Sequence, residues 1–302
     1  MADNIDTLLK ESRVYQPTAE TKAVAYIQDY ESAYKKSIAD PEEFWSSVAK
    51  ELVWFSPWNK VLEWNYPWAK WFVGATCNIA YNCLDRHVTT WRKNKVAIIW
   101  VGENDQERVI TYGELYRQVN RCANALKKIG LTKGDRVTIY LPKVPEQIVA
   151  MLACARIGLI HSVVYSGFSA PALANRIQDA ESKLVITADV GFDRGKVLNL
   201  KPVVDQAVAN SPTVEHVVVL RRQIPYVSLS TPKEIDWHDW VKGEKAVCAA
   251  EPLDAEHPLY ILYTSGTTGK PKGVVHVHGG YMVGTYITTK YVFDLKEDDV
   301  YF

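Results

Sequence analysis

The most informative segment of the chain is Tyr260-Ile-Leu-Tyr-Thr-Ser-Gly-Thr-Thr-Gly-Lys-Pro-Lys-Gly-Val-Val-His-Val-His278. An apolar run ends at Tyr263, ten loop residues follow, and β-branched character resumes at Val274. The three glycines of the loop allow close backbone approach, and its four hydroxyls and two lysines can donate to anionic oxygens. We therefore predict a strand–loop–strand unit whose loop surrounds a polyphosphate.

This loop differs from the Walker loop of NTPases. The Walker motif needs four residues between its glycines and a Ser or Thr after its lysine. Here two residues separate Gly266 from Gly269, and Pro271 follows Lys270. The alternative is a flexible hairpin without a ligand, but a plain turn has no use for so many donors. We favour phosphate binding.

Strand and helix patterns alternate along the chain from about residue 96. The expected strands are 96–101, 136–141, 159–165, 183–187 and 214–220, and the expected helices are 111–130, 145–158, a helix capped by Ser169, and 197–209. This alternation predicts an α/β fold, with a mostly parallel sheet and flanking helices on both faces. Four prolines between residues 221 and 258 indicate loops and short elements there.

The first ninety residues have a different character. Six of the ten tryptophans lie there, at Trp45, Trp54, Trp58, Trp64, Trp68 and Trp71. Asp40-Pro41-Glu42-Glu43 predicts a helix start, whereas Pro57 and Pro67 predict irregular structure between them. The rings are expected to pack against other parts of the protein, and a ligand platform is the less favoured alternative. We predict a helical, aromatic-rich segment over residues 1–90, followed by an α/β domain over 91–302.

Composition excludes several protein classes. The chain has 302 residues, 47% of them hydrophobic, with 35 Lys plus Arg against 35 Asp plus Glu. This balance argues against disorder, nucleic-acid binding and attachment to anionic membranes. The basic doublets Lys35-Lys36, Lys127-Lys128 and Arg221-Arg222 are interpreted as solvated faces. No signal peptide or membrane span is evident, so a cytoplasmic location is expected.

Cysteine and histidine spacing gives no indication of a metal site. The five cysteines include no C-x-x-C pair, which predicts reduced and mostly buried thiols. His276 and His278 alternate, so both would point to one side of a strand. A metal pair would need a third ligand, and none is evident nearby. We interpret the two histidines as polar members of a strand beside a nucleotide site, without a catalytic role.

The segment Thr264-Ser-Gly-Thr-Thr-Gly-Lys-Pro-Lys-Gly273 resembles the phosphate-binding signature of the adenylate-forming superfamily. Other parts of the chain are similar to the AMP-forming acetyl-CoA synthetase branch, namely residues 259–263, His-Val-His-Gly-Gly-Tyr at 276–281, 161–169 and the aromatic region 30–87. The resemblance covers nearly the whole chain from about residue 25. It implies that the α/β part is the N-terminal part of that family's large domain, incomplete on its C-terminal side.

The resemblance implies a two-step ligase reaction. Acetate or a similar short-chain acid attacks the α-phosphate of MgATP to give an acyl-adenylate and pyrophosphate, and coenzyme A then displaces AMP. The family motif places the ATP phosphates on Thr264, Ser265, Gly266, Thr267, Thr268, Gly269, Lys270 and Lys272. The implied substrates and cofactor are therefore ATP, coenzyme A and Mg²⁺.

The resemblance also implies positions for coenzyme A. A basic loop of the family that contacts the coenzyme A phosphates matches Asp193, Arg194, Gly195 and Lys196. The family pattern has arginines at the first and last of these positions, so this chain loses the planar guanidinium at its usual place. A solvated turn between a strand and a helix is the alternative interpretation. Tyr165, Ser166 and Gly167 match the strand end that the family places beside the pantetheine.

The family pattern continues beyond residue 302, including its catalytic lysine. We therefore expect an N-terminal fragment that is inactive alone, with Asp298–Phe302 beginning another strand. Its partners would be small-molecule substrates and a missing C-terminal portion or partner chain, not nucleic acid or membrane. Two alternatives stay open: a non-catalytic nucleotide- or CoA-binding remnant or subunit, and a ligase for a longer-chain or aryl acid.

Overall fold

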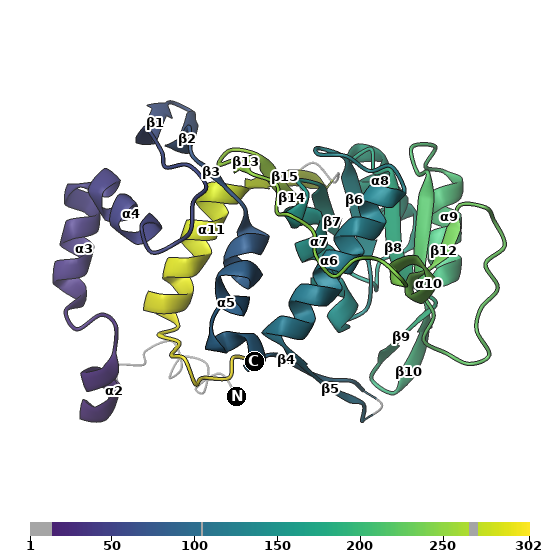
Figure 1. Ribbon diagram of the computed structural model, residues 1–302, viewed down its shortest axis with the longest axis horizontal. Coiled ribbons are helices and arrows are strands. Elements are labelled where there is room, and N and C mark those ends of the chain that lie inside the picture. Colours follow the sequence, from purple (N-terminus) through teal and green to yellow (C-terminus); the bar gives the residue numbers. More distant parts are fainter. Residues whose placement is uncertain (1–13, 104, 266–270) are drawn as a thin grey trace, which may run out of the picture. The chain divides into compact units, whose positions relative to one another are not determined.

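The computed structural model describes residues 14–103, 105–265 and 271–302 (Figure 1). The chain divides into two compact units, one formed by Met1–Val48 with Gly284–Phe302 and the other by Ala49–Val283. The larger unit contains the sheet and every element on which the candidate site depends.

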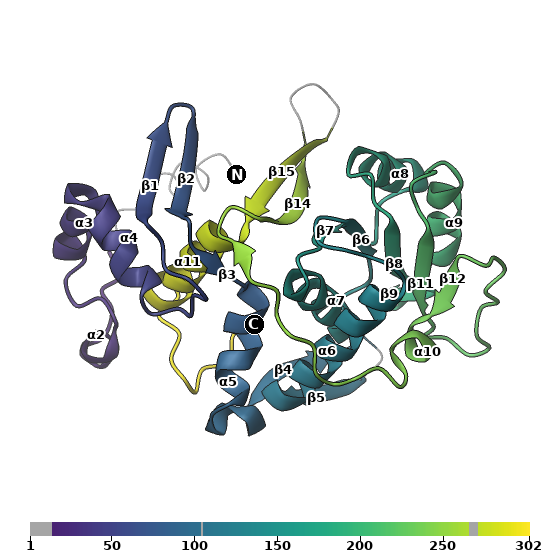
Figure 2. The same cartoon turned by 45° about the horizontal axis from the view of Figure 1, so that its top comes forward.

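A seven-stranded sheet forms the centre of the larger unit (Figure 2). Its strands, in sheet order, are β12 (Glu234–Asp236), β11 (His216–Leu220), β8 (Leu184–Ala188), β6 (Arg136–Tyr140), β7 (Ile160–Val163), β14 (Pro258–Thr264) and β15 (Lys272–Val277). Neighbouring strands are parallel except at the edge, where β14 and β15 are antiparallel. All five residues of β8 are buried, as expected for a strand covered on both faces.

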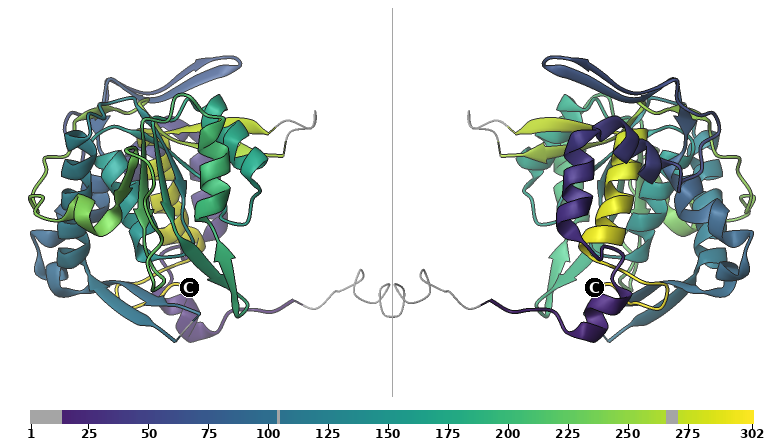
Figure 3. Two further views of the ribbon diagram at one scale, coloured as in Figure 1. Left: turned by 90° about the vertical axis from the view of Figure 1, so that its right-hand side faces the viewer. Right: turned by 90° about the vertical axis from the view of Figure 1, so that its left-hand side faces the viewer.

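Helices cover both faces of this sheet (Figure 3). On one face α6 (Tyr112–Lys128) packs with α7 (Pro145–Arg156) and α10 (Trp237–Val241), and on the other α8 (Ala170–Asp179) packs with α9 (Lys201–Ala209). The prediction of an α/β fold with a mostly parallel sheet is confirmed.

The start and end of α6 follow local sequence signals. The Thr111 hydroxyl accepts a hydrogen bond from the amide of Glu114 at 3.2 Å, which satisfies one free donor of the first turn. The Glu114 carboxylate bonds Gln118 and Arg117 further along the helix. After the helix, Gly130 adopts a φ of +89°, a conformation that ends helices and favours glycine.

The predicted helix over 197–209 is wrong in its first part. A β-hairpin of β9 (Val190–Asp193) and β10 (Lys196–Asn199) precedes α9. Arg194 and Gly195 at its tip both have positive φ, at 51° and 72°. Two consecutive residues of this kind form the tight turn that joins antiparallel strands. The apolar residues of β10, Val197 and Leu198, therefore belong to a strand pair and not to the start of the helix.

The aromatic-rich region is more regular than its sequence predicts, because β1 (Lys60–Asn65) and β2 (Trp68–Val73) form a hairpin. The Phe72 ring contacts Trp54 and Trp58 at centroid distances of 5.1 and 5.3 Å. Trp64 and Trp68 are 64% and 74% exposed. The predicted packing of the aromatic rings therefore holds for only part of the tryptophans.

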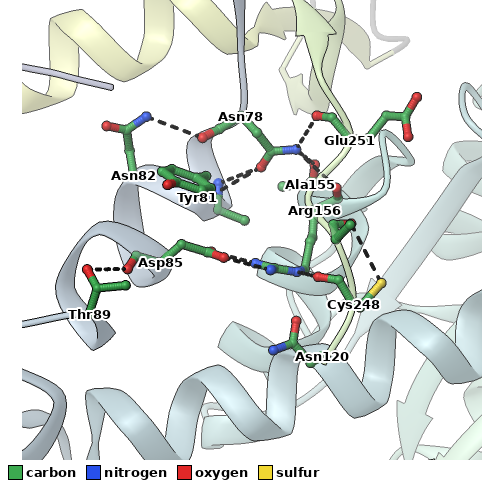
Figure 4. Close-up of polar contacts among 12 residues, drawn as sticks. Asn78, Tyr81, Asn82, Asp85, Thr89, Asn120, Ala155, Arg156, Cys248 and Glu251 are labelled. Carbon is green, nitrogen blue, oxygen red and sulfur yellow. Dashed lines mark hydrogen bonds and ion pairs between the residues drawn. The ribbon is translucent and has the colours of Figure 1, made fainter. Parts of the chain in front are cut away.

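Shorter elements complete the larger unit: β3 (Thr76–Cys77), η1 (Tyr81–Asp85), α5 (Arg86–Val88), η2 (Trp91–Asn94), β4 (Val96–Val101), β5 (Glu107–Thr111) and β13 (Leu253–Asp254). The buried Asn78 amide nitrogen lies 3.1, 3.0 and 3.0 Å from the carbonyl oxygens of Ala155, Arg156 and Glu251 (Figure 4). These bonds attach the segment before η1 to the end of α7.

The remaining helices are α2 (Ala19–Val24), α3 (Tyr30–Ala39), α4 (Pro41–Ala49), α11 (His278–Ile287) and η3 (Thr288–Val292). The Asp40 carboxylate accepts a hydrogen bond from the Glu43 amide at 3.0 Å, which confirms the predicted helix start. Within the smaller unit, the Tyr26 amide donates to the Asp294 carboxylate at 2.9 Å. Asp298–Phe302 forms no strand, contrary to the prediction.

All five cysteines are free, and four of them are buried, as predicted; Cys83 is exposed. Burial raises the pKa of the Cys77 thiol to about 12. Along the described ranges, no helix has the length and apolar character that crossing a membrane requires.

Candidate functional site

A cavity of about 530 Å³ lies where several parallel strands end. The strand β6 has β7 on one side and β8 on the other. The chain leaves β6 through α7 and returns from β7 through α8, and these helices cover opposite faces of the sheet. Such a reversal opens a crevice at the carboxyl ends of the strands, where α/β proteins bind ligands.

The walls of the cavity come from segments that are distant in sequence. Residues following β6, β7, β8 and β11 contribute, together with the last residues of β14. The aromatic wall residues are Trp100, Tyr165, Phe168, Phe192 and Tyr263, and the charged ones are Glu103, Lys143, Arg176, Asp193 and Arg222. An aromatic lining with a few charged groups suits a planar, anionic ligand.

The segment after β7 forms one wall of this cavity. Tyr165 and Ser166, two of the residues matched to the pantetheine side, line it. The Tyr140 hydroxyl lies 2.8 Å from the Ser166 carbonyl oxygen and 2.7 Å from that of Phe168. These contacts attach the segment to the end of β6. Burial raises the pKa of Tyr140 to about 12, which keeps this hydroxyl a donor. A side chain at Gly167 would approach the Tyr165 ring to 2.4 Å, so glycine leaves room for the ring.

The predicted basic turn lies beside the cavity but contributes little charge to it. Of its four residues, only Asp193 lines the cavity. The amide of Gly195 donates to the Glu103 carboxylate at 3.1 Å, and this bond lowers the pKa of Glu103. The turn joins two strands, so the expected turn between a strand and a helix is corrected; Arg194 and Lys196 belong to this hairpin.

The base of the predicted phosphate loop is a strand pair. In β14 and β15, Thr264 lies opposite Lys272, and both are exposed. This confirms the two strands of the strand–loop–strand prediction. Thr264, Ser265 and Lys272 are described, whereas Gly266, Thr267, Thr268, Gly269 and Lys270 lie outside the described residues.

Tyr263 connects the base of this loop to the helix layer. Its hydroxyl donates to the Asp179 carboxylate of α8 at 2.6 Å. The guanidinium of Arg176 lies 5.6 Å from the Tyr263 ring and 4.6 Å from the Phe168 ring. The end of β14 and the segment after β7 therefore contact the same helix.

The sequence analysis missed three basic residues of the cavity, Lys143, Arg176 and Arg222. Interpreting the Arg221-Arg222 doublet as a solvated face is wrong, since Arg221 bonds Asp236 at 2.6 Å and Arg222 is half-buried in the cavity. Lys143 and Arg222 follow shortly after the predicted strands 136–141 and 214–220. Their position just after the carboxyl end of a predicted parallel strand was the signal that could have identified Lys143 and Arg222.

The two histidines after the loop do not share one side of a strand. His276 lies in β15 and stacks on Tyr260 at 4.5 Å, whereas His278 is the first residue of α11. The His278 side chain is fully buried, which lowers its pKa to about 3. Among the residues that the structure describes, no cluster of three or more His, Cys, Asp or Glu is arranged to hold a metal.

Comparison with known proteins gives two family matches. A model described as AMP-binding enzyme matches residues 84–302, and one described as acetyl-coenzyme A synthetase N-terminus matches residues 30–83. Acetyl-coenzyme A synthetases of Deinococcus radiodurans and Chlorobaculum tepidum are 51% and 46% identical over 99% and 100% of this chain. The chain covers 46% of each, so it spans about half the length of these relatives.

A solved structure has the same fold. Acetoacetyl-CoA synthetase from Streptomyces lividans matches with a TM-score of 0.86 and 28% sequence identity, over 94% of this chain and 46% of that one.

Proposed function

This chain belongs to the AMP-binding enzyme family. On that premise we propose that it forms part of an acid–CoA ligase that activates acetate. One observation carries the proposal. The segment after β7 and the last residues of β14 line the same cavity, so the proposed thiol side and the base of the proposed phosphate loop are neighbours. The sequence identity of 51% and 46% to two acetyl-coenzyme A synthetases supports acetate as the acid.

In the first proposed step, a carboxylate oxygen of acetate attacks the α-phosphorus of ATP, and the bond to the bridging oxygen of pyrophosphate breaks. Negative charge then accumulates on the leaving pyrophosphate, which fixed positive groups and hydrogen-bond donors stabilise. We assign this role to Lys272, to the hydroxyls of Thr264 and Ser265, and to the loop residues 266–270. The Mg²⁺ is proposed as part of the MgATP substrate, where it neutralises phosphate charge.

In the second proposed step, the sulfur of the coenzyme A thiol attacks the acyl carbon, the bond from that carbon to the phosphate oxygen of AMP breaks, AMP leaves, and the thiol proton is released to solvent. We propose that Tyr165, Ser166 and Gly167 lie along the pantetheine, and that residues 193–196 lie at the nucleotide end. The cavity would orient the thiol and exclude water from the acyl-adenylate. We also propose a domain boundary near residue 90, supported by the meeting of the two family matches at residues 83 and 84.

The phosphate assignment is tested by titrating the chain with MgATP in a calorimeter. Lys270→Ala and Lys272→Ala are each expected to weaken binding about tenfold, because a charged hydrogen bond contributes about 1.5–3 kcal/mol. The exposed Lys128, which bonds Glu244 just after α10, gives the control Lys128→Ala. Equal affinity in all four proteins would refute the assignment of phosphate binding to Lys270 and Lys272.

The chemical step is tested in a chimera that joins this chain to the remaining part of the Deinococcus radiodurans relative. We expect exchange of labelled pyrophosphate into ATP that depends on acetate. Exchange driven by a longer-chain or aryl acid but not by acetate would refute the substrate. Exchange that survives Lys272→Ala unchanged would refute the residue assignment.

A further inference from the structure

Arg222 is a half-buried arginine in the wall of the cavity. It follows β11 directly after Arg221. Its guanidinium lies over the ring of Phe192 at 5.0 Å, and its Nη1 donates to the carbonyl oxygen of Val190 at 3.2 Å. These two contacts hold the side chain in the wall and leave guanidinium donors free for a ligand.

Within the described residues, no carboxylate forms an ion pair with the guanidinium of Arg222. The neighbouring arginines Arg108, Arg156 and Arg221 each have one. The two acids that influence it, Glu146 and Asp189, have other partners. Glu146 bonds Arg108 at 2.7 Å. The Asp189 carboxylate accepts from the backbone amides of Val190, Arg222 and Gln223.

Burial lowers the pKa of Arg222, because desolvation disfavours the charged form. A guanidinium nevertheless keeps its proton in a protein. A partly desolvated cation without a counter-charge is costly, and an anionic ligand in the cavity would offset that cost.

The second cation considered is Lys143, whose charge also acts on the Glu103 carboxylate of the same wall. Lys143 is exposed, and its carbonyl oxygen accepts from the Trp100 indole at 2.8 Å, which fixes that ring in the cavity wall. Arg176 is less accessible than Arg222: its side chain is buried, lies against the rings of both Phe168 and Tyr263, and bonds the Ala172 carbonyl. Among the basic residues of the wall, Arg222 and Lys143 are therefore the more accessible to a ligand.

We propose that Arg222, assisted by Lys143, binds a phosphate group at the nucleotide end of coenzyme A. The proposal rests on the proposed function of the cavity. It departs from the sequence assignment, because the turn places Asp193 in the cavity and engages the Gly195 amide with Glu103. A guanidinium suits the role because its planar donors bond two phosphate oxygens at once.

The test is calorimetric titration of the chain with coenzyme A and with adenosine 3′,5′-bisphosphate. Arg222→Gln is expected to weaken both ligands about tenfold or more, because it removes a charged donor pair. Arg222→Lys should keep part of the affinity, and Lys143→Ala should lose a smaller part. Arg121→Gln removes the same charge from the exposed side of α6 and should change affinity less than about twofold.

Unchanged affinity of Arg222→Gln, with a wild-type melting temperature, would overturn the proposal while leaving the proposed function intact. If Arg222→Gln does not fold, wild-type affinity in both Arg222→Lys and Lys143→Ala would overturn it. Failure of the wild-type chain to bind coenzyme A would instead contradict the proposed function of the cavity. Comparison with 3′-dephospho-CoA locates the contact: loss of the preference for coenzyme A in Arg222→Gln assigns the 3′-phosphate, and equal weakening of both assigns the diphosphate.

Discussion

The guanidinium of Arg156 forms a two-point ion pair with the carboxylate of Asp85, from Nη1 to Oδ2 at 2.7 Å and from Nη2 to Oδ1 at 2.8 Å (Figure 4). The Arg156 side chain is 1% exposed, and its Nε also donates to the Cys248 carbonyl oxygen at 2.7 Å. One buried cation thus holds the end of η1, the end of α7 and the segment before β13 together.

Asp85→Asn should destabilise the fold strongly, because it leaves a buried guanidinium without its counter-charge. Loss of one partner of a buried pair costs about 3–5 kcal/mol. The measurement is urea unfolding followed by circular dichroism. Arg117→Gln, which breaks an exposed pair with Glu114, is the control and should cost about 1 kcal/mol or less. A smaller cost for Asp85→Asn than for the control would contradict the structural role of the pair.

Acid should destabilise the larger unit through two buried histidines. Burial lowers the pKa of His161 to about 4 and that of His278 to about 3. Between these values and about 6.5 the unfolded chain binds protons that the folded chain does not, so the free energy of unfolding falls as pH falls through that window. From pH 7 to pH 5 each histidine should contribute a loss of about 2 kcal/mol.

The check is urea unfolding at several pH values between 7 and 5, for the wild type and for His278→Gln. The variant should lose less stability over this range, whatever its stability at pH 7. If the free energy of unfolding has the same pH dependence in both proteins, burial does not lower the pKa of His278.

The aromatic hairpin gives a comparison within one strand. Phe72 is 1% exposed and contacts two tryptophan rings, whereas Trp68 is 74% exposed. Phe72→Ala should cost about 3–5 kcal/mol, and Trp68→Ala about 0.5 kcal/mol or less. Thermal unfolding measures both. Similar melting temperatures for the two variants would contradict the division of the aromatic residues into packed and exposed sets.

Tyr263 should connect stability and nucleotide binding. Tyr263→Phe removes the hydrogen bond to Asp179, which should cost about 1 kcal/mol of stability and weaken MgATP because the end of β14 is no longer fixed on α8. Asp179→Asn keeps an acceptor for the same hydroxyl and should have a smaller effect on both. If Tyr263→Phe binds MgATP like the wild type, the contact has no part in positioning the loop.

Local sequence signals predicted much of this architecture. The caps at Asp40 and Thr111, the glycine after α6 and the alternation of strands and helices all have their physical cause within a few neighbouring residues. The β9–β10 hairpin was missed because two adjacent apolar residues, Val197 and Leu198, occur at the start of a helix as readily as in a strand, and the deciding feature was the backbone conformation of Arg194 and Gly195.

For the candidate site, the sequence drew attention only to residues that carry a motif. The loop after β14 and the segment after β7 have such motifs, and of the second segment Tyr165 and Ser166 line the cavity. Arg222 and Lys143 reach it because the sheet order brings the ends of β11 and β6 to one edge. That order depends on tertiary pairing, which no local pattern encodes.

The central claim is that the cavity at the carboxyl ends of β6, β7 and β14 binds coenzyme A. Hydrogen exchange of the chain, measured by mass spectrometry with and without coenzyme A, tests this claim most directly. We predict slower exchange in peptides containing residues 165–167, 191–196 and 222, with no change in β1 and β2. Binding that leaves these peptides unchanged, or that protects only segments outside the cavity, would contradict the account.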